Sequence, residues 1–137
     1  MNPPARLVVD TDVISLIFRD DSRASFYLEV IDGCSLLVSF MTIAELHRWT
    51  LRRDWGVKRR LELEAFLSNF AMYNSDDILC ERWAEVTEMG RKQGRPINCA
   101  DAWIAATAFA LDCPLVTHNP KDYEMIGGLQ VISQIKS

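Results

Sequence analysis

Carboxylate side chains stand at four places in the chain where oxygen ligands for a cation would be useful. Asp10 and Asp12 directly follow a short apolar run, and Glu45, Asp101 and Asp122 each lie near the start of a predicted helix or just after a predicted strand. Carboxylates that meet in a partly buried crevice repel one another and become protonated, unless a divalent cation removes the conflict. Hard oxygen ligands without a Cys or His cluster suit Mg²⁺ or Mn²⁺.

Each acid taken alone also fits a structural role at a helix start. The segment Thr42-Ile43-Ala44-Glu45 matches a capping box, in which the acid accepts hydrogen bonds from backbone N–H groups. Asn98-Cys99-Ala100-Asp101 is a looser version of this pattern, and Asp10, Thr11 or Asp12 would serve as an ordinary N-cap. For any single acid, the pattern favours capping over chemistry.

Capping explains the acids less well as a group. Asp101 continues the apolar stripe of Ile104, Ala105 and Ala108, since these spacings place residues on one helix face. An acid that only caps a helix would point away from that buried side. Asp10 ends a strand of core character and is also expected to be poorly solvated. Together the acids indicate a shared, partly buried site.

The elements that must position these residues are short apolar runs that alternate with helical periodicity. The pattern predicts strands at 6–9, 36–39, 71–73, 114–117 and 129–132, and helices at about 13–19, 24–31, 42–53, 57–70, 76–93 and 98–111. It therefore predicts an α/β fold, a single domain over residues 1–137 whose short parallel sheet is flanked by helices on both faces. The alanine-rich helix at 98–111 has the small side chains that let a helix lie close to a sheet.

Such a sheet would bring the polar residues to one edge, because ligands of open α/β sheets bind at the carboxyl ends of the strands. The residues that follow the predicted strands, or open the helices after them, are expected to share one crevice: Asp10, Asp12, Glu45, Asp101, Asn119 and Asp122.

The overall charge is acidic but unevenly distributed. With 19 acidic against 15 basic residues the formal net charge is −4, which at first argues against a nucleic-acid partner. Segment 48–60, however, holds six basic residues and one acid, with Trp49 and Trp55 between them. This segment is either a surface that contacts phosphate groups or docks a partner peptide, or a solvated helix face with its tryptophans in the core. In the first case the arginines expected to contact the phosphates are Arg48, Arg52 and Arg53.

We find no targeting signal in the sequence. No apolar run approaches the roughly 20 residues of a membrane span, and Leu7-Val8-Val9 is too short for a signal-peptide core. The four cysteines form no C-x-x-C pair, which argues against a zinc site. These observations predict a cytoplasmic protein that does not associate with membranes.

Four segments resemble PIN-domain ribonucleases, in particular the VapC-type toxins of prokaryotic toxin–antitoxin pairs. They occur in the order of that family and span almost the whole chain: Val8-Val9-Asp10-Thr11-Asp12-Val13-Ile14-Ser15, Ser39-Phe40-Met41-Thr42-Ile43-Ala44-Glu45-Leu46, Ala100-Asp101-Ala102-Trp103-Ile104-Ala105-Ala106-Thr107-Ala108 and Leu115-Val116-Thr117-His118-Asn119-Pro120-Lys121-Asp122-Tyr123. One such segment is weak evidence, and four in order are strong evidence.

The resemblance implies that Asp10, Glu45 and Asp101 bind the metal. The fourth acid departs from the family, because many members carry Asp where this chain has Asn119, and here the next acid is Asp122. We expect Asp122 to serve as the fourth catalytic acid and metal ligand, with Asn119 in support. The other supporting residues are Asp12, which stands where Asn is frequent in the family, and the hydroxyl residues Thr11 and Thr117.

The resemblance further implies an endoribonuclease that hydrolyses RNA phosphodiester bonds with a metal-activated water, using one or two Mg²⁺ or Mn²⁺ ions. It implies a homodimer and a neutralising VapB-like antitoxin. Two alternatives remain open at this point. The first is a catalytically weak PIN-like module that binds RNA or an antitoxin. The second is a haloacid-dehalogenase-like phosphatase, in which Asp10 would be the nucleophile and Asp12 the general acid.

Overall fold

Five strands form one parallel sheet in the computed structural model, which describes residues 3–136. The strands are β1 (Arg6–Val9), β2 (Ser35–Ser39), β3 (Ala71–Tyr73), β4 (Leu115–Val116) and β5 (Val131–Ile132), in the order β3-β2-β1-β4-β5. Every neighbouring pair is parallel. The helices between them are α1 (Thr11–Phe18), α2 (Ala24–Ile31), α3 (Phe40–Arg52), α4 (Val57–Leu67), α5 (Asp77–Lys92), α6 (Cys99–Leu111) and the short 3₁₀ helix η1 (Pro120–Tyr123).

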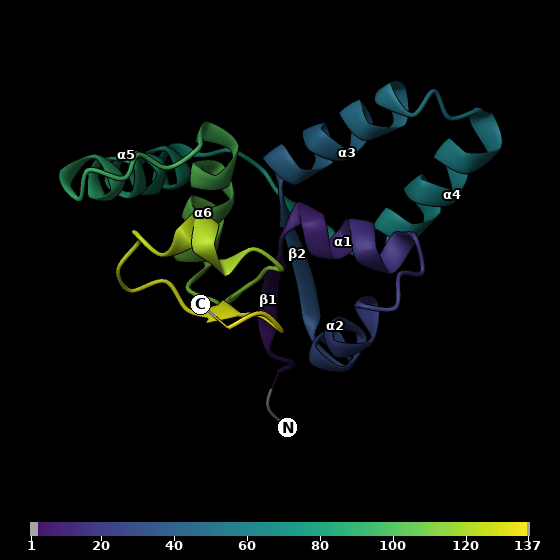
Figure 1. Cartoon of the computed structure of the whole chain (residues 1–137), viewed down its shortest axis with the longest axis horizontal. Coiled ribbons are helices and arrows are strands. Elements are labelled where there is room, and N and C mark those ends of the chain that lie inside the picture. Colours follow the sequence, from purple (N-terminus) through teal and green to yellow (C-terminus); the bar gives the residue numbers. More distant parts are fainter. Residues whose placement is uncertain (1–2, 137) are drawn as a thin grey trace.

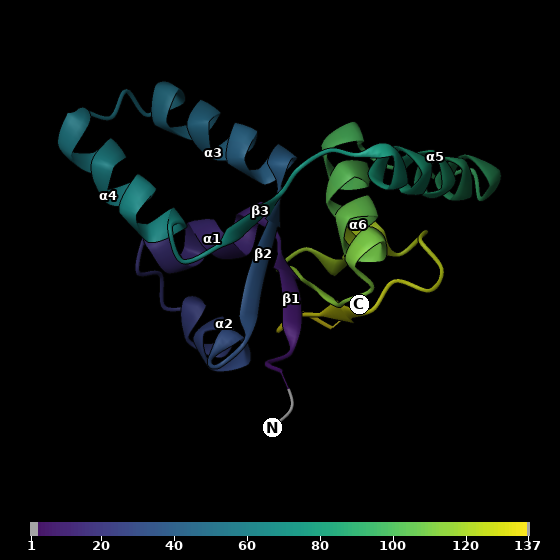
Figure 2. The ribbon, with the colours of Figure 1, turned by 180° about the vertical axis from the view of Figure 1, so that it is seen from behind.

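The helices lie on both faces of the sheet, as predicted from the alternation of patterns. In Figures 1 and 2, α1 and α2 lie on one side of β1 and β2, and α5 and α6 lie on the other. The helices α3 and α4 form a hairpin that extends away from the sheet on the side of α1. The predicted α/β fold with a parallel sheet is therefore confirmed.

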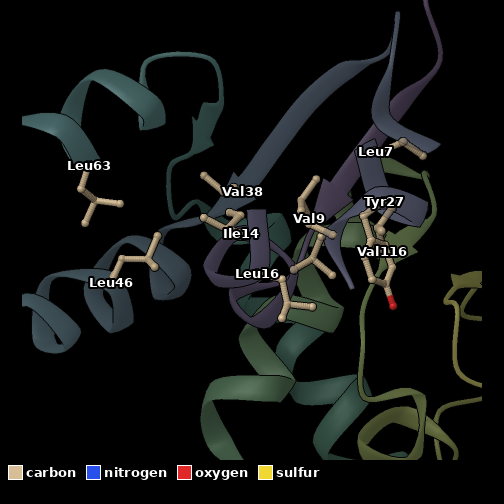
Figure 3. Packing of buried hydrophobic residues seen from close by; sticks show 11 residues of the cluster. Leu7, Val9, Ile14, Leu16, Tyr27, Val38, Leu46, Leu63 and Val116 are labelled. Carbon is tan, nitrogen blue, oxygen red and sulfur yellow. The ribbon is translucent and has the colours of Figure 1, made fainter. Parts of the chain in front are cut away.

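Successive residues of β1 supply two separate hydrophobic cores, because neighbouring side chains of a strand point to opposite faces. Leu7 and Val9 pack in one cluster with residues of α1 and α2, and Figure 3 shows Val9 beside Ile14 in this cluster. Val8 packs in the second cluster with residues of α5 and α6. Because β1 is buried on both faces, its interior positions are all apolar.

Two helices begin earlier than predicted because side chains ahead of them cap their first turns. The side chain of Asp10 accepts a hydrogen bond from Thr11 N at 2.7 Å, so α1 begins at Thr11. Ser39 Oγ accepts from Met41 N at 3.0 Å, so α3 begins at Phe40. The predicted capping box with Thr42 as its first residue is therefore wrong, since Thr42 already lies inside α3.

The small residues of α6 allow it to pack directly on the sheet. Ala102, Ala105 and Ala108 are fully buried and belong to the same core cluster as Val8 of β1 and Leu115 of β4. Because α6 begins at the carboxyl edge of the sheet, this packing also fixes the position of its first turn relative to that edge. Among residues 3–136, no helix has both the length and the apolar character that a membrane span requires.

A larger side chain at Ala105 should destabilise the protein without any effect on charge. Replacing Ala105 by Leu inserts three carbons between α6 and the sheet, and such overpacking costs about 1–3 kcal/mol of unfolding free energy. Urea denaturation measures this loss, with Ala84→Leu on the exposed side of α5 as the control, expected to change stability by less than about 0.5 kcal/mol. Equal stability of the two variants would contradict close packing of α6.

Candidate active site

A pocket of about 320 Å³ lies at the carboxyl ends of the central strands and gathers residues from both ends of the chain. Its lining residues include five carboxylates: Asp10, Asp12, Glu45, Asp101 and Asp122. Thr11, Ser15, Leu46, Trp49 and Asn119 complete the lining. Figure 1 shows why they meet, since α1 and α3 leave the neighbouring ends of β1 and β2. The structure thus brings together all six polar residues expected to share one crevice.

Asp10 stands at the base of the pocket and is only 6% exposed. Besides Thr11 N, its carboxylate accepts hydrogen bonds from Thr117 Oγ1 at 2.8 Å and from the Tyr123 hydroxyl at 2.9 Å. These donors favour the charged form, but burial and the nearby charge of Asp12 outweigh them and raise the pKa of Asp10 to about 7. Asp10 therefore serves as the cap of α1 and also lies in the pocket.

Asp101 faces the pocket from the first turn of α6. Asn98 is the residue that caps this helix, through a 2.9 Å hydrogen bond from Ala100 N to its side-chain oxygen. Asp101 is consequently not needed as a cap. Burial and the negative charges of Asp10, Asp122 and Glu45 together raise its pKa to about 7. The pocket therefore concentrates negative charge on half-buried groups.

Glu45 is held by a pair of threonines rather than by a helix end. Thr11 Oγ1 lies 2.7 Å from Glu45 Oε1 and 3.0 Å from the hydroxyl of the buried Thr42. The Thr11 hydroxyl thus orients Glu45, and the backbone N–H of Thr11 donates a hydrogen bond to Asp10. Thr42, which the sequence suggested as a cap, instead supports this contact from one turn before Glu45.

Asp12 is bound by the segment that follows β4. Its Oδ2 accepts hydrogen bonds from His118 N at 3.1 Å and from Asn119 Nδ2 at 3.0 Å. Burial is the main cause that raises the pKa of Asp12 to about 6. Asn119 is thus tied to a carboxylate through its amide nitrogen, and Asp122, in η1, is exposed at the rim of the pocket.

Tyr123 is the residue of this site that sequence reasoning missed. It is 2% exposed, and its hydroxyl lies 2.9 Å from Asp10 Oδ2 and 3.5 Å from Asp101 Oδ1. An aromatic residue after a polar loop is typical of a core anchor, and η1, which turns Tyr123 back under the pocket, was not predicted. The only available signal was its position directly after Asp122 in the fourth matching segment.

The donor chemistry of the pocket fits a hard divalent cation. Among the described residues that line it, none is Lys, Arg or His, so no side chain of the pocket neutralises the acids. Asp12 Oδ1 is buried and has no hydrogen-bond partner within the described part of the chain. In residues 3–136, however, no three Asp, Glu, His or Cys side chains stand close enough together to hold a metal ion as they are. The ligand types are present, and the acids are not drawn together.

The predicted RNA-contacting arginines lie outside the pocket. Arg48, Arg52 and Arg53 are exposed along α3 and just after it, on the helix that also carries Glu45. Trp49 and Trp55 are half-buried and pack against each other, with ring centroids 4.7 Å apart. The tryptophans thus belong to the core, as one interpretation of this segment held, and the arginines remain free to meet a ligand.

Comparison with known proteins places this geometry in a family. The ribonuclease VapC1 of Haemophilus influenzae (strain R2866) is 26% identical over 125 residues, which cover 90% of this chain and 93% of the relative. The structure of VapBC-1 from nontypeable Haemophilus influenzae superposes with a TM-score of 0.79 at 26% identity, covering 93% of this chain and 97% of that one. VapBC2 from Rickettsia felis, solved with a DNA fragment from its promoter, shares the fold with a TM-score of 0.82 at 20% identity, covering 93% and 98%.

The family described as PIN domain matches residues 7–127, a span that contains all five carboxylates of the pocket and the strands and helices that position them. On this evidence the chain belongs to the PIN-domain family.

Proposed function

We propose that the protein is a metal-dependent endoribonuclease of the VapC type, which hydrolyses RNA phosphodiester bonds and is neutralised by a VapB-like antitoxin. The observation that carries this proposal is the pocket itself, where five carboxylates from distant parts of a PIN domain meet, with no cationic side chain among the described residues of the lining. The relatives named ribonuclease VapC1 support the reaction class. Mg²⁺ or Mn²⁺ is the ion that the oxygen ligands favour.

The residues of the chain divide the work of this reaction. Asp10, Glu45 and Asp101 would hold the ion from the ends of three elements, with Asp122 approaching from the rim. A bound ion supplies an activated water and offsets the negative charge of the phosphate. Thr11 and Thr117 orient Glu45 and Asp10, and Asn119 fixes Asp12.

Arg48, Arg52 and Arg53 are proposed to contact the RNA backbone. All three are exposed, and α3 places them on the helix whose first turns carry Glu45. Phosphate contacts of this kind position a strand without reading its sequence. The net charge of −4 is compatible with such contacts because the basic residues lie outside the acidic pocket.

The alternatives differ in what they require of the pocket. A phosphatase of the haloacid-dehalogenase type needs a lysine for the phosphate, and no lysine is among the described residues that line the pocket. A module that binds RNA without cutting it has Asn119 in its favour, and metal-dependent cleavage by the purified protein decides between binding and catalysis. A homodimer and a cytoplasmic location remain predictions.

The antitoxin is proposed to cover the apolar groove between α3 and α4. This groove has a volume of about 320 Å³ and is lined by residues that include Leu51, Val57 and Leu61. These side chains are 72%, 63% and 56% exposed, which is costly for an apolar surface that has no partner. The relatives solved as VapBC complexes support a protein partner.

Asp101→Asn should abolish RNA cleavage and leave the fold intact. The substitution removes one charged oxygen ligand from a crowded site, so we expect a loss of at least about a hundredfold in the rate of cleavage of total RNA. Asp112→Asn, at the opposite end of the same helix, is the matched control and should cleave like the wild type. Full activity of Asp101→Asn, or of the wild type in excess EDTA, would rule out this mechanism.

The stability of the metal-free protein should depend on Asp10 in a defined direction. Its pKa is about 7 in the folded protein against 3.8 for an ordinary Asp, so the folded state binds the proton more tightly and the free energy of unfolding falls as pH rises from about 4 to 7. We therefore expect the melting temperature in EDTA to fall between pH 5 and pH 8, and to fall further for the wild type than for Asp10→Asn.

The same comparison controls for His118, because this residue is present in both proteins. Burial lowers the pKa of His118, so its contribution to the free energy of unfolding rises with pH, opposite to that of Asp10. Mg²⁺ should raise the melting temperature of the wild type more at pH 8 than at pH 5, because the acids are charged at the higher pH. Parallel pH profiles of the two proteins would contradict the burial of a protonated Asp10.

A charge in the apolar groove should weaken binding of the antitoxin. Leu61→Glu places a carboxylate on the surface that the partner is proposed to cover, and we expect at least a tenfold loss of affinity, about 1.4 kcal/mol, for an antitoxin encoded beside this gene. Ile78→Glu on α5, at a similarly exposed position (51%), is the control and should bind normally. Isothermal titration calorimetry measures both, and equal affinities would place the antitoxin elsewhere.

A further inference from the structure

Tyr123 lies between two carboxylates of the pocket, Asp10 and Asp101. Its hydroxyl is within hydrogen-bond distance of Asp10 Oδ2 (2.9 Å) and of Asp101 Oδ1 (3.5 Å). Across the described residues, it is the one side-chain group with hydrogen bonds to two acids of the pocket. Asp10 caps α1 on one face of the sheet, and Asp101 lies in the first turn of α6 on the other face. The contact therefore links elements from the two faces of the sheet.

Asp101 depends on this contact more than Asp10 does. Asp10 has two further donors, Thr11 N and Thr117 Oγ1, whereas Tyr123 is the only hydrogen-bond partner of the Asp101 carboxylate within the described chain. Without that partner, the negative charges of Asp10, Glu45 and Asp122 would push Asp101 away from the others. The single O–H proton of Tyr123 is directed at Asp10 Oδ2, 2.9 Å from the hydroxyl oxygen, and also lies near Asp101 Oδ1, 3.5 Å from the same oxygen, and this shared contact opposes the repulsion.

A tyrosine suits this task because its donor carries no charge. A lysine in the same place would neutralise one carboxylate and compete with a cation for it. A tyrosine hydroxyl is a neutral donor at neutral pH, and this one is buried. The two acids therefore share a hydrogen-bond partner when no ion is bound, and that partner adds no positive charge to compete with an ion.

We propose that Tyr123 is a positioning residue whose hydroxyl keeps the carboxylates of Asp10 and Asp101 near each other, so that a divalent cation has less movement of these two acids to bring about when it binds. This role rests on the proposed metal site. The hydroxyl acts through the two acids and takes no part in breaking the phosphodiester bond. Partners of this kind orient metal ligands in many proteins, and their loss costs about 10–100-fold in metal affinity.

The test is the affinity for Mn²⁺ in the absence of RNA, measured by isothermal titration calorimetry on the intact chain. Tyr123→Phe removes only the hydroxyl, and we expect its Mn²⁺ affinity to fall by about tenfold or more. Tyr73→Phe is the matched control, since the Tyr73 hydroxyl also bonds a carboxylate, Asp76 Oδ2 at 2.7 Å, but far along the chain from the pocket acids. Its Mn²⁺ affinity should equal that of the wild type.

Tyr27→Phe distinguishes positioning from a general loss of stability. The Tyr27 hydroxyl is also buried, and it contacts His118 Nδ1 at 2.6 Å and no acid of the pocket. This variant should lose thermal stability and keep its Mn²⁺ affinity within about threefold. If Tyr27→Phe weakens Mn²⁺ binding as much as Tyr123→Phe does, the positioning role is overturned.

A double-mutant cycle adds a readout that structural damage would not produce. If Tyr123 acts through Asp101, then Tyr123→Phe should weaken Mn²⁺ binding much less in an Asp101→Asn background than in the wild type. Additive losses would overturn the proposal, and so would a Tyr123→Phe variant with unchanged affinity.

The design also separates this proposal from the proposed nuclease. A wild type that binds Mn²⁺ through Tyr123-dependent acids and cleaves no RNA would overturn the nuclease and uphold the role of Tyr123. A wild type that cleaves RNA with Mn²⁺, beside a Tyr123→Phe variant of equal Mn²⁺ affinity, would overturn the role of Tyr123 alone.

Discussion

Crowded negative charge at the carboxyl edge of the sheet is the constraint to which the surrounding structure responds. Five carboxylates line one pocket. Two of them, Asp10 and Asp101, are so poorly solvated that burial, together with the neighbouring charges, raises their pKa values to about 7. Four of the five acids, Asp10, Asp12, Glu45 and Asp101, accept hydrogen bonds from neutral donors of threonine, asparagine, tyrosine or the backbone, and none of these donors removes the charge of the acid. The arrangement preserves electrostatic stress that a divalent cation would relieve.

Parallel topology is what makes this crowding possible in a short chain. A parallel sheet puts the carboxyl ends of its strands at one edge, so residues as distant in sequence as Asp10 and Asp101 become neighbours. The two cores hold that edge in place from opposite sides, with α1 on one face and α6 on the other. The alanines of α6 bring its first turn close to β1, and this closeness sets where Asp101 stands.

The sequence was sufficient to predict most of the fold, because strands buried on both faces are continuous apolar runs and the helices have clear periodicity. Asp10, Glu45 and Asp101 could be assigned to one crevice from the topology alone. Their individual contacts could not, since Thr42 and Ser39 are both plausible caps and only the three-dimensional structure shows that Ser39 caps α3. Tyr123 was missed because its role depends on η1, a turn of four residues that no periodicity announces.

Leu46 of α3 borders two cavities, the acidic pocket on one side and the apolar groove of the α3–α4 hairpin on the other. Its side chain is 1% exposed and lies between the two cavities. Glu45 precedes it on the same helix turn. A molecule that reaches Leu46 from the groove would therefore lie one side chain away from the acidic pocket, so the two cavities share a wall even though they suit different ligands.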